Sequence, residues 1–460
     1  MVPLLAVVDA GATGLVVLLD VALILVVSRL FGRMLRGVGQ PAVVGEILAG
    51  IALGPTLLGL LAPDVLSALF PDDVRGVLKA VATVGLVLFM FGVGHESDLG
   101  QMRRMGRRVG ALSVGSVAVP AVAGVAVALL LWPAHDVVAG EEVPLAAFAA
   151  FLAIALSVTA FPVLARILDE AGLLRAPIGA LAMTVAAVTD LVAWSALAVV
   201  VAATGDGGRS LVVTGVLVVV YAVVLVGVVR PGLRLVVARL TPAPALAPAA
   251  VLLVGLALSA GATEALGLHA AIGAFAFGLV VPRGTAEDGA GDGATCEAGN
   301  GRALAVGDGA AVRVAGPAER GAAALGTAGR VLVPVFFLTT GLTVDLTGLT
   351  GAGLATMALL FVVATLAKFG GVGLAARLSG AGLRESAALG TLMNARGLTE
   401  LVILEVGRSA GILDEVTFTA LVGVALLTTV LTGPLFRRLH RPPGPGTAAP
   451  AAAPSWGLAD

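Results

Sequence analysis

Long apolar runs, bounded by arginine, glycine, proline or acidic residues, recur along most of the chain. About 20 apolar residues form a helix about 30 Å long, which matches the hydrocarbon thickness of a bilayer. Helices are expected because a spanning segment must satisfy its own backbone hydrogen bonds. The pattern predicts an all-α polytopic membrane protein with about thirteen transmembrane helices. The expected spans lie near residues 11–30, 41–61, 74–94, 108–132, 145–168, 176–203, 210–229, 247–266, 268–282, 328–347, 352–376, 384–408 and 413–436.

Composition places the chain in lipid and narrows its chemistry. Hydrophobic residues make up 58% and charged residues 12% of the chain, against about 45–50% and about 25% in soluble domains. Cys296 is the only cysteine, so neither an intramolecular disulfide nor a cysteine metal cluster is expected. The net charge of -1, without basic stretches interleaved with aromatic residues, predicts no nucleic-acid partner. The residues predict no cofactor and no enzyme activity.

Basic residues are distributed unevenly between alternate loops. Cytoplasmic loops of membrane proteins are enriched in Lys and Arg. One set of loops carries Arg75, Lys79, Arg209 and Arg408. The opposite set is much richer, with Arg29, Arg33, Arg36, Arg103, Arg104, Arg107, Arg108, Arg230, Arg234, Arg239, Arg437, Arg438 and Arg441. This bias predicts a multi-pass protein of the cell inner (plasma) membrane, with the N-terminus outside and the C-terminus in the cytoplasm.

Two stretches cannot build a hydrophobic core of their own. Residues 283–327 are rich in Gly and Ala with mixed charges, and residues 437–460 are rich in Pro and Ala. Such compositions favour flexible or disordered chain. We therefore expect one transmembrane domain over residues 1–436, with a flexible cytoplasmic loop at 283–327 and a disordered cytoplasmic tail at 437–460.

Short sequences recur in the same order in the two halves of the chain. The matched pairs are GQPAVVGEILAGIALGP (39–55) with GLHAAIGAFAFGLVVP (267–282), FMFGVGHESDL (89–99) with FFLTTGLTVDL (336–346), and AGLL (171–174) with AGIL (410–413). The first copy enters the membrane from the cytoplasm and the second from outside, so the repeats, about 39–203 and 267–436, are inverted. Inverted repeats are typical of secondary transporters, whose ion sites lie at broken helices near the bilayer midplane.

The fifth and twelfth spans are the candidates for broken helices. The fifth contains Ser157 and Thr159 just before Pro162, and the twelfth contains Asn394 and Gly397. Both sets can interrupt a helix and leave oxygen atoms free near the midplane. A proline kink in an ordinary packed bundle is the alternative, because Pro and Gly are common in membrane helices.

Asp190 and Lys368 are charged residues inside predicted spans. Asp190 lies at the centre of its span, about 20 Å of helix from either end, so it cannot reach water. Such a carboxylate is a functional candidate by default, with a structural salt bridge as the alternative. Burial favours its neutral form, which suits a group that exchanges a proton for a cation. Lys368 can pair with Asp190 or trade protons with it, or it can extend its charge toward the cytoplasmic surface.

Arg396 lies inside the twelfth span and has two candidate partners. Glu400 is one helical turn away and suits an (i, i+4) pair. Glu46, the acidic residue of the second span, is the other candidate. The sequence does not choose between them.

Several stretches together resemble the second monovalent cation:proton antiporter family, which holds bacterial sodium/proton antiporters and potassium-efflux transporters. The resemblance covers nearly the whole chain. It is carried by GQPAVVGEILAGIALGP, ALSVTAFPVLARILDE in the fifth span, TDLVAW from Thr189, PVFFLTTGL from Pro334 and NARGLTELVILEVG from Asn394.

The resemblance implies an inverted-repeat fold with two crossed broken helices, a homodimer in membrane lipid and an elevator mechanism. By position, Asp190 looks like the family's cation- and proton-binding aspartate, and Lys368 like the lysine that pairs with it. Thr159 and Ser157 look like oxygen donors near the ion. Thr189 departs from the sodium-exchanging pattern, because electrogenic members carry a second aspartate there.

The sequence thus predicts a secondary antiporter that exchanges a monovalent cation, sodium or potassium, for protons, with Asp190 as the cation ligand. A major-facilitator-like drug exporter is one alternative, since GQMRRMGRR at 100–108 partly mimics a loop of that family. Arg104 stands where that motif needs an aspartate, however, and inverted halves do not suit that fold. A channel or sensor that kept the antiporter fold is the other alternative.

Overall fold

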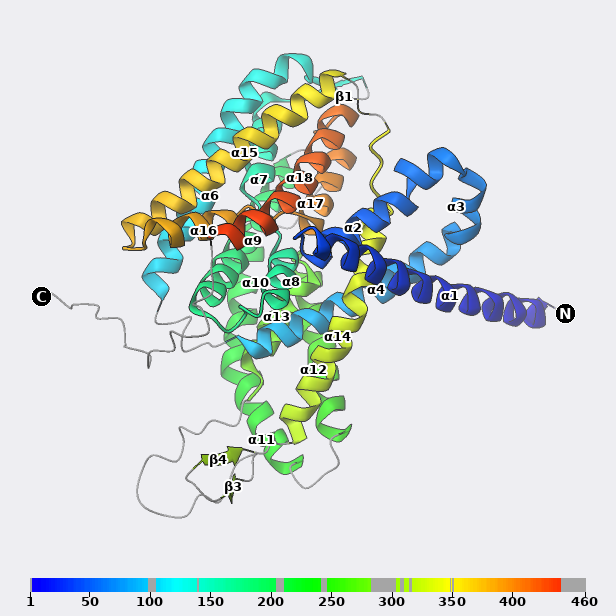
Figure 1. Cartoon of the computed structure of the whole chain (residues 1–460), viewed down its shortest axis with the longest axis vertical. Helices are drawn as coiled ribbons and strands as arrows, with labels where there is room; N and C mark the ends of the chain where they lie inside the picture. The colour runs from blue at the N-terminus through cyan, green and yellow to red at the C-terminus, as the bar shows by residue number, and fades with distance from the viewer. Residues whose placement is uncertain are drawn as a thin grey trace, which may run out of the picture.

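The computed structural model describes residues 2–97, 105–138, 140–203, 211–240, 246–282, 303–306, 310–313, 317–347, 349 and 351–439. The chain is helical in these ranges apart from two short antiparallel hairpins and the connections (Figure 1). The hairpins pair β1 (Val137–Val138) with β2 (Glu141–Glu142), and β3 (Ala303–Val306) with β4 (Ala310–Arg313). The prediction of an all-α membrane fold is confirmed.

Eleven helices in the described ranges are long and apolar enough to cross a membrane. The shorter apolar helix α13 (Ala270–Val280) lies where the ninth span is expected. The twelfth expected span is occupied by two shorter helices, α16 (Leu383–Met393) and α17 (Leu398–Ser409). The total of about thirteen spans stays a prediction.

The helices pack as two units. The scaffold unit consists of α1 (Val2–Gly37), α2 (Ala42–Leu53), α4 (Asp72–Glu96), α12 (Leu246–Ala265), α13 and α14 (Pro317–Gly341). The core unit consists of α6 (Gly106–Leu131), α7 (Leu145–Ser157), α8 (Phe161–Glu170), α9 (Pro177–Ala203), α15 (Gly351–Leu378), α16, α17 and α18 (Glu415–Leu439). Figure 1 shows α6 and α15 of the core unit side by side, and α4 beside α14 in the scaffold unit.

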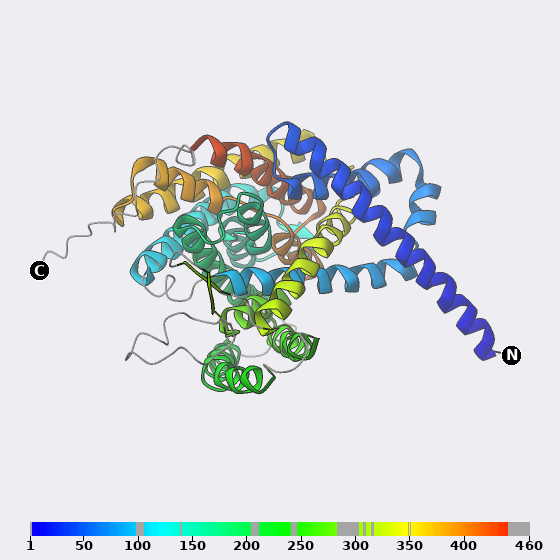
Figure 2. The ribbon, with the colours of Figure 1, turned by 60° about the horizontal axis from the view of Figure 1, so that its bottom comes forward.

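Shorter elements join or flank these units. A π-helical turn, η1 (Pro55–Gly59), and helix α3 (Pro63–Leu69) connect α2 to α4, and a 3-10 turn, η2 (Trp132–Ala134), ends α6. Helix α10 (Leu211–Val224), the π-helical turn η3 (Leu225–Val229) and α11 (Arg230–Leu240) form one rod that contacts α9, α12 and α13. In Figure 2, α1 projects beyond the other helices toward its N-terminal end.

Large apolar side chains are exposed on the outward faces of several helices. They include Leu18 and Leu19 on α1, Val219 and Val223 on α10, and Leu366 on α15. Contiguous exposed apolar surface is unusual for a protein in water, whereas the surrounding lipid of a membrane protein is as apolar as leucine. These faces are available to lipid.

Glycines set the closest helix contacts. A side chain at Gly371 of α15 would collide with the backbone of Gly115 on α6, and the reverse also holds. The same relation joins Gly50 of α2 to Gly341 of α14. Small residues at membrane helix interfaces let backbones approach closely, which is the main source of packing energy where no water is expelled. The α6–α15 contact lies one helical turn from Lys368.

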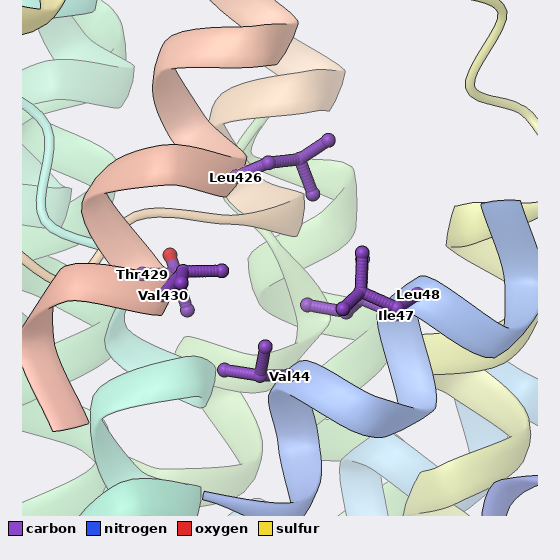
Figure 3. Close-up of a pocket in the computed structure, with 6 residues that line it drawn as sticks. All are labelled: Val44, Ile47, Leu48, Leu426, Thr429 and Val430. Atoms are coloured by element: carbon purple, nitrogen blue, oxygen red, sulfur yellow. The ribbon is translucent and has the colours of Figure 1, made fainter. Parts of the chain in front are cut away.

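The two units meet partly through an apolar contact between α2 and α18. Val44, Ile47 and Leu48 face Leu426, Thr429 and Val430 across a cavity of about 10 Å³ (Figure 3). A space of this size has room for about one water at most, and its walls offer little polar surface. This part of the contact is therefore mainly apolar, and Arg437 near the end of α18 adds a hydrogen bond to the carbonyl of Gly39, just before α2.

The predicted loop at 283–327 is too long at its C-terminal end. Helix α14 begins at Pro317, so residues 317–327 are helical. Pro317 and Glu319 are favourable in the first turn of a helix, and Gly326 lets α14 approach Gly92 of α4 closely. Strands β3 and β4 also fall inside this stretch. Residues 283–302, the tail from 440, and Arg103, Arg104, Arg209 and Arg441 of the loop comparison lie outside the described residues.

The α6–α15 contact predicts that Gly371→Ala destabilises the protein. The new methyl group collides with backbone and must push the two helices apart, at a cost of about 1–3 kcal/mol. Thermal denaturation in detergent, followed by fluorescence-detected size-exclusion chromatography, measures the loss. Gly370→Ala is the matched control, because a side chain at Gly370 meets open space. Equal stability of the two variants would contradict the proposed close packing.

Candidate functional site

Two helices of the core unit are interrupted at facing positions. Helix α7 ends at Ser157 and α8 begins at Phe161, while α16 ends at Met393 and α17 begins at Leu398. The N–H of Ala160 donates to the carbonyl of Ala395 at 2.9 Å. The Thr159 hydroxyl donates to the carbonyl of Met393 at 2.8 Å. The two interruptions are thus hydrogen-bonded to each other.

Two buried cations satisfy the last carbonyls of α7. The Arg396 guanidinium donates to the carbonyls of Ala155 and Leu156, both at 2.6 Å, and the Lys368 ammonium donates to the carbonyl of Ser157 at 2.5 Å. The end of a helix leaves carbonyls without partners and carries a partial negative charge. In a site without water, cationic donors compensate both. Lys368 and Arg396 therefore stabilise the interruption itself.

The Lys368 ammonium is surrounded by oxygen atoms. Besides the Ser157 carbonyl, it donates to the carbonyl of Ser116 at 3.0 Å, the hydroxyl of Ser116 at 2.9 Å and the hydroxyl of Thr159 at 3.0 Å. Its side chain is fully buried. An ammonium has three N–H donors, and all of them have acceptors here. Among the described residues, Lys368 makes no ion pair with Asp190, although its charge acts on that carboxylate.

Asp190 lies on α9 and is 2% exposed. It accepts a hydrogen bond from the backbone N–H of Phe161, the first residue of α8. The N-terminus of a helix carries a partial positive charge and stabilises an anion. The Oδ1 oxygen of Asp190 has no hydrogen-bond partner among the described residues. One carboxylate oxygen thus stays open for a proton or a cation.

Thr189 is also buried, but its hydroxyl donates to the carbonyl of Ala186 one turn earlier in α9, at 3.0 Å. The Ser157 hydroxyl is held in a similar way, donating to the carbonyls of Ala153 at 2.6 Å and Val117 at 3.1 Å. The oxygen that Ser157 offers to Lys368 is its carbonyl. Of the residues predicted to supply oxygen atoms to the ion, Thr159 through its hydroxyl and Ser157 through its carbonyl both accept hydrogen bonds from Lys368.

The structure resolves the choice of partner for Arg396. Its guanidinium pairs with Glu400 at 2.6 Å, and both side chains are fully buried. Glu46 of α2 instead pairs with Arg166 of α8 at 3.0 Å. The sequence left this choice open: the (i, i+4) spacing offered Glu400 as one of two candidates, and the second pair joins residues far apart in the chain.

Arg166 and its neighbours form a charged contact between the two units, which the sequence analysis missed. Arg166 also pairs with Glu170 at 3.1 Å, and Glu170 accepts a bond from the N–H of Ala42 at the start of α2, at 2.7 Å. These groups border a cavity of about 250 Å³ between α1, α2, α8 and α14. The sequence signal for this contact was the presence of acidic residues one turn after Arg166, because this spacing indicates a charged helix face.

Arg330 of α14 extends this charged contact. It donates to Asp169 of α8 at 3.1 Å and to Glu96 of α4 at 2.5 Å. Helix α8 therefore carries an interrupted N-terminus facing Asp190 and a charged C-terminal half facing the scaffold unit. Ser116 of α6 is the other residue that the sequence analysis missed, since a serine in an apolar helix is an ordinary feature.

A family model described as "Sodium/hydrogen exchanger, transmembrane" matches residues 21–441. The chain belongs to this exchanger family. The resemblance drawn from the sequence motifs is thereby confirmed, and so is the expectation of a multi-pass membrane transporter rather than an enzyme. The orientation of the termini stays a prediction.

Several antiporters are similar to this chain over most of its length. Na(+)/H(+) antiporter NhaS4 of Synechocystis sp. is 33% identical over 436 residues, which cover 94% of this chain and 98% of the relative. Cation/H(+) antiporter 20 of Arabidopsis thaliana is 34% identical over 92% of this chain and 48% of the relative. K(+)/H(+) antiporter 1 of Saccharomyces cerevisiae is 30% identical over 92% and 46%. The chain spans about half the length of the plant and yeast relatives.

Solved structures show the same fold. The structure of the sodium proton antiporter MjNhaP1 from Methanocaldococcus jannaschii superposes with a TM-score of 0.57 at 12% identity. The superposition covers 92% of this chain and 96% of the MjNhaP1 chain. At this identity, the similarity concerns the fold alone.

Outside its candidate membrane spans, the protein has an ion pair between His135 and Asp414, with Nδ1 and Oδ2 2.8 Å apart. The hydrogen bond that His135 donates to the Asp414 carboxylate raises the pKa of His135 above 6.5, although burial opposes the shift. Burial acts to raise the pKa of Asp414, but hydrogen bonds from His135 and Thr417 outweigh it and hold that pKa below 3.8. The pair joins the connection after α6 to the start of α18.

This pair predicts a pH-dependent difference in stability between the wild type and His135→Gln. A histidine with a raised pKa in the folded state contributes stability fully below about pH 6.5 and loses it as the pH rises through the folded value. The wild type should exceed the variant by about 1 kcal/mol near pH 6, and the difference should vanish near pH 9. Thermal unfolding in detergent across this range measures it. A difference that does not change with pH would show that the charged pair has no role.

Proposed function

We propose that the protein is a secondary antiporter that exchanges a monovalent cation, sodium or potassium, for protons at Asp190. One observation carries the proposal: the carboxylate of Asp190 is buried in the core unit beside two interrupted helices, and its Oδ1 has no hydrogen-bond partner in the part of the chain that the structure describes. Relatives named Na(+)/H(+), K(+)/H(+) and cation/H(+) antiporters agree with this chemistry.

Competition between proton and cation follows from the electrostatics. A carboxylate without water or a paired charge is costly inside a membrane. It becomes stable either by protonation or by binding a cation, and one free oxygen serves for either. The N–H of Phe161 holds the other side of the carboxylate in both states. Thr159 and Ser157 lie at the same interruption and supply oxygens close to the ion.

The packing supports an elevator-type alternation of access. Asp190, Lys368, Arg396 and Glu400 all lie on the core unit. The α2–α18 contact between the two units is mainly apolar around Val44, Ile47 and Leu426, and one hydrogen bond, from Arg437 to the carbonyl of Gly39, crosses it near the end of α18. Movement of one unit against the other can therefore carry the site across the membrane, while the charged contacts of α8 break and form again. A homodimer that holds the scaffold unit still in the bilayer is part of the same proposal.

A channel or sensor that kept the fold is the second candidate, favoured by nothing particular in the described site. A drug exporter would need a binding cavity large enough for an organic molecule. The cavity of about 250 Å³ between α1, α2, α8 and α14 is bordered by paired charged groups. It does not suit an apolar substrate.

Replacement of Asp190 by Asn tests the assignment. The amide keeps the shape but cannot exchange a proton for a cation, so cation-dependent proton flux should fall to the background of empty vesicles. Acridine-orange dequenching in everted membrane vesicles, with sodium and potassium each tested across pH 6 to 9, measures the flux. The variant should remain folded at normal abundance, as shown by size-exclusion chromatography. Residual exchange in a correctly folded Asp190→Asn protein would exclude Asp190 as the carrier.

The charge moved per cycle is the next property that the site predicts. Lys368 donates all its protons to oxygen acceptors, and Thr189 replaces a second carboxylate. We therefore expect Lys368 to stay protonated and the exchange to be electroneutral, with one proton per cation. Each net charge moved would couple to voltage by about 2.3 kcal/mol per 100 mV, so the two stoichiometries respond very differently.

Transient currents on a solid-supported membrane decide between them. We expect no sustained charge movement in the wild type when a cation gradient is applied. Lys368→Gln should be less stable, because the carbonyl of Ser157 loses its cationic donor, but should keep some exchange. A sustained cation-driven current in the wild type that disappears in Lys368→Gln would show that the lysine carries a second proton.

A further inference from the structure

We infer that Ser116 on α6 is a positioning residue for the exchange: it holds the Lys368 ammonium among oxygen atoms and thereby keeps the free oxygen of Asp190 open to the cation. This inference rests on the proposed function. Ser116 lies on α6, which is not one of the interrupted helices.

The reach of Lys368 to α6 depends on the close helix contact. Gly115 and Gly371 bring the two backbones together, because a side chain at either position would collide with the other helix. Ser116 follows Gly115 directly, and Lys368 precedes Gly371 by about one turn. The lysine side chain can therefore meet both the carbonyl and the hydroxyl of Ser116.

Ser116 supplies two of the four oxygen atoms bound to the ammonium, at 3.0 and 2.9 Å. The remaining two come from Ser157 and Thr159. Ser116 is itself fully buried, so no water replaces its hydroxyl. Hydrogen bonds from a charged donor are about twice as strong as those between neutral groups. The hydroxyl of Ser116 therefore contributes directly to where the ammonium rests.

The unpartnered Oδ1 of Asp190 is the competing acceptor for the ammonium. The charge of Lys368 already acts on Asp190 without an ion pair between them. Removal of the Ser116 hydroxyl weakens the oxygen-bound position and lets the ammonium move toward the carboxylate. The transported cation must then displace an ammonium in order to bind, and the proton competes against the same charge.

The Ser116→Ala variant is predicted to raise the KM for sodium or potassium about tenfold, with kcat largely kept. The optimum of exchange should also move to lower pH, because an ammonium beside the carboxylate disfavours its protonation. Both are measured by the same vesicle assay. Ser116→Thr restores a hydroxyl and should return the KM toward the wild-type value. Ser113→Ala is the matched control, one turn earlier on α6, because the hydroxyl of Ser113 is buried and has no hydrogen-bond partner within the described ranges.

A double mutant separates positioning from simple packing. If Ser116 acts through Lys368, Ser116→Ala should change nothing further in a Lys368→Gln protein. Stabilisation of the purified protein by NaCl or KCl against choline chloride reports cation binding even where flux is low. An undiminished effect of Ser116→Ala in the Lys368→Gln background, or a wild-type KM and pH profile in the single variant, overturns the inference alone. Absence of cation-dependent proton flux in the wild type overturns the proposed function as well.

Discussion

The open end of helix α7 is the constraint on which the rest of the site depends. A helix that stops inside a membrane leaves carbonyls without water to satisfy them, and each unsatisfied group is costly there. Arg396 and Lys368 meet this need at Ala155, Leu156 and Ser157. These cations then require acidic or oxygen partners of their own. Glu400 pairs with Arg396, and oxygen atoms of Ser116 and Thr159 accept hydrogen bonds from Lys368.

The same arrangement explains why Asp190 remains available. Lys368 is engaged by the interruption, so it does not neutralise the carboxylate by direct pairing. The first N–H of α8 contributes a partial charge at Asp190 but leaves one oxygen open. An interrupted helix thus provides two environments a few residues apart. Its carbonyl end holds a fixed protein cation, and its amide end faces the carboxylate that we propose binds a mobile one.

Features that depend on local chemistry were accessible from the sequence. The spans follow from apolar runs of membrane length, and the (i, i+4) spacing made Glu400 one of two candidate partners for Arg396, which lies just before α17. The burial of Asp190 follows from its central place in a span. The interruptions coincide with residues that resist helical geometry or compete with it. Each of these needs only neighbouring residues to be read correctly.

The contacts that escaped prediction depend on how distant helices are rotated and how closely they approach. Ser116 meets Lys368 only because Gly115 and Gly371 admit the approach of α6 and α15, and Arg166 meets Glu46 only because α8 lies against α2. The same serine or arginine on a helix rotated by half a turn would face lipid. The start of α14 at Pro317 is similar, since its extra turns are stabilised by contacts with α4.

The groups that we propose bind or position the ion, from Ser116 on α6 to Asp190 on α9, belong to one packed unit whose interrupted helices are hydrogen-bonded together. A cargo bound there would keep the same ligands throughout its journey, so no energy barrier would arise from exchanging one coordination shell for another. Ion preference and turnover speed would then be encoded in separate parts of the molecule. Evolution could retune the first within the core unit and the second along the surface of the scaffold, without either adjustment disturbing the other.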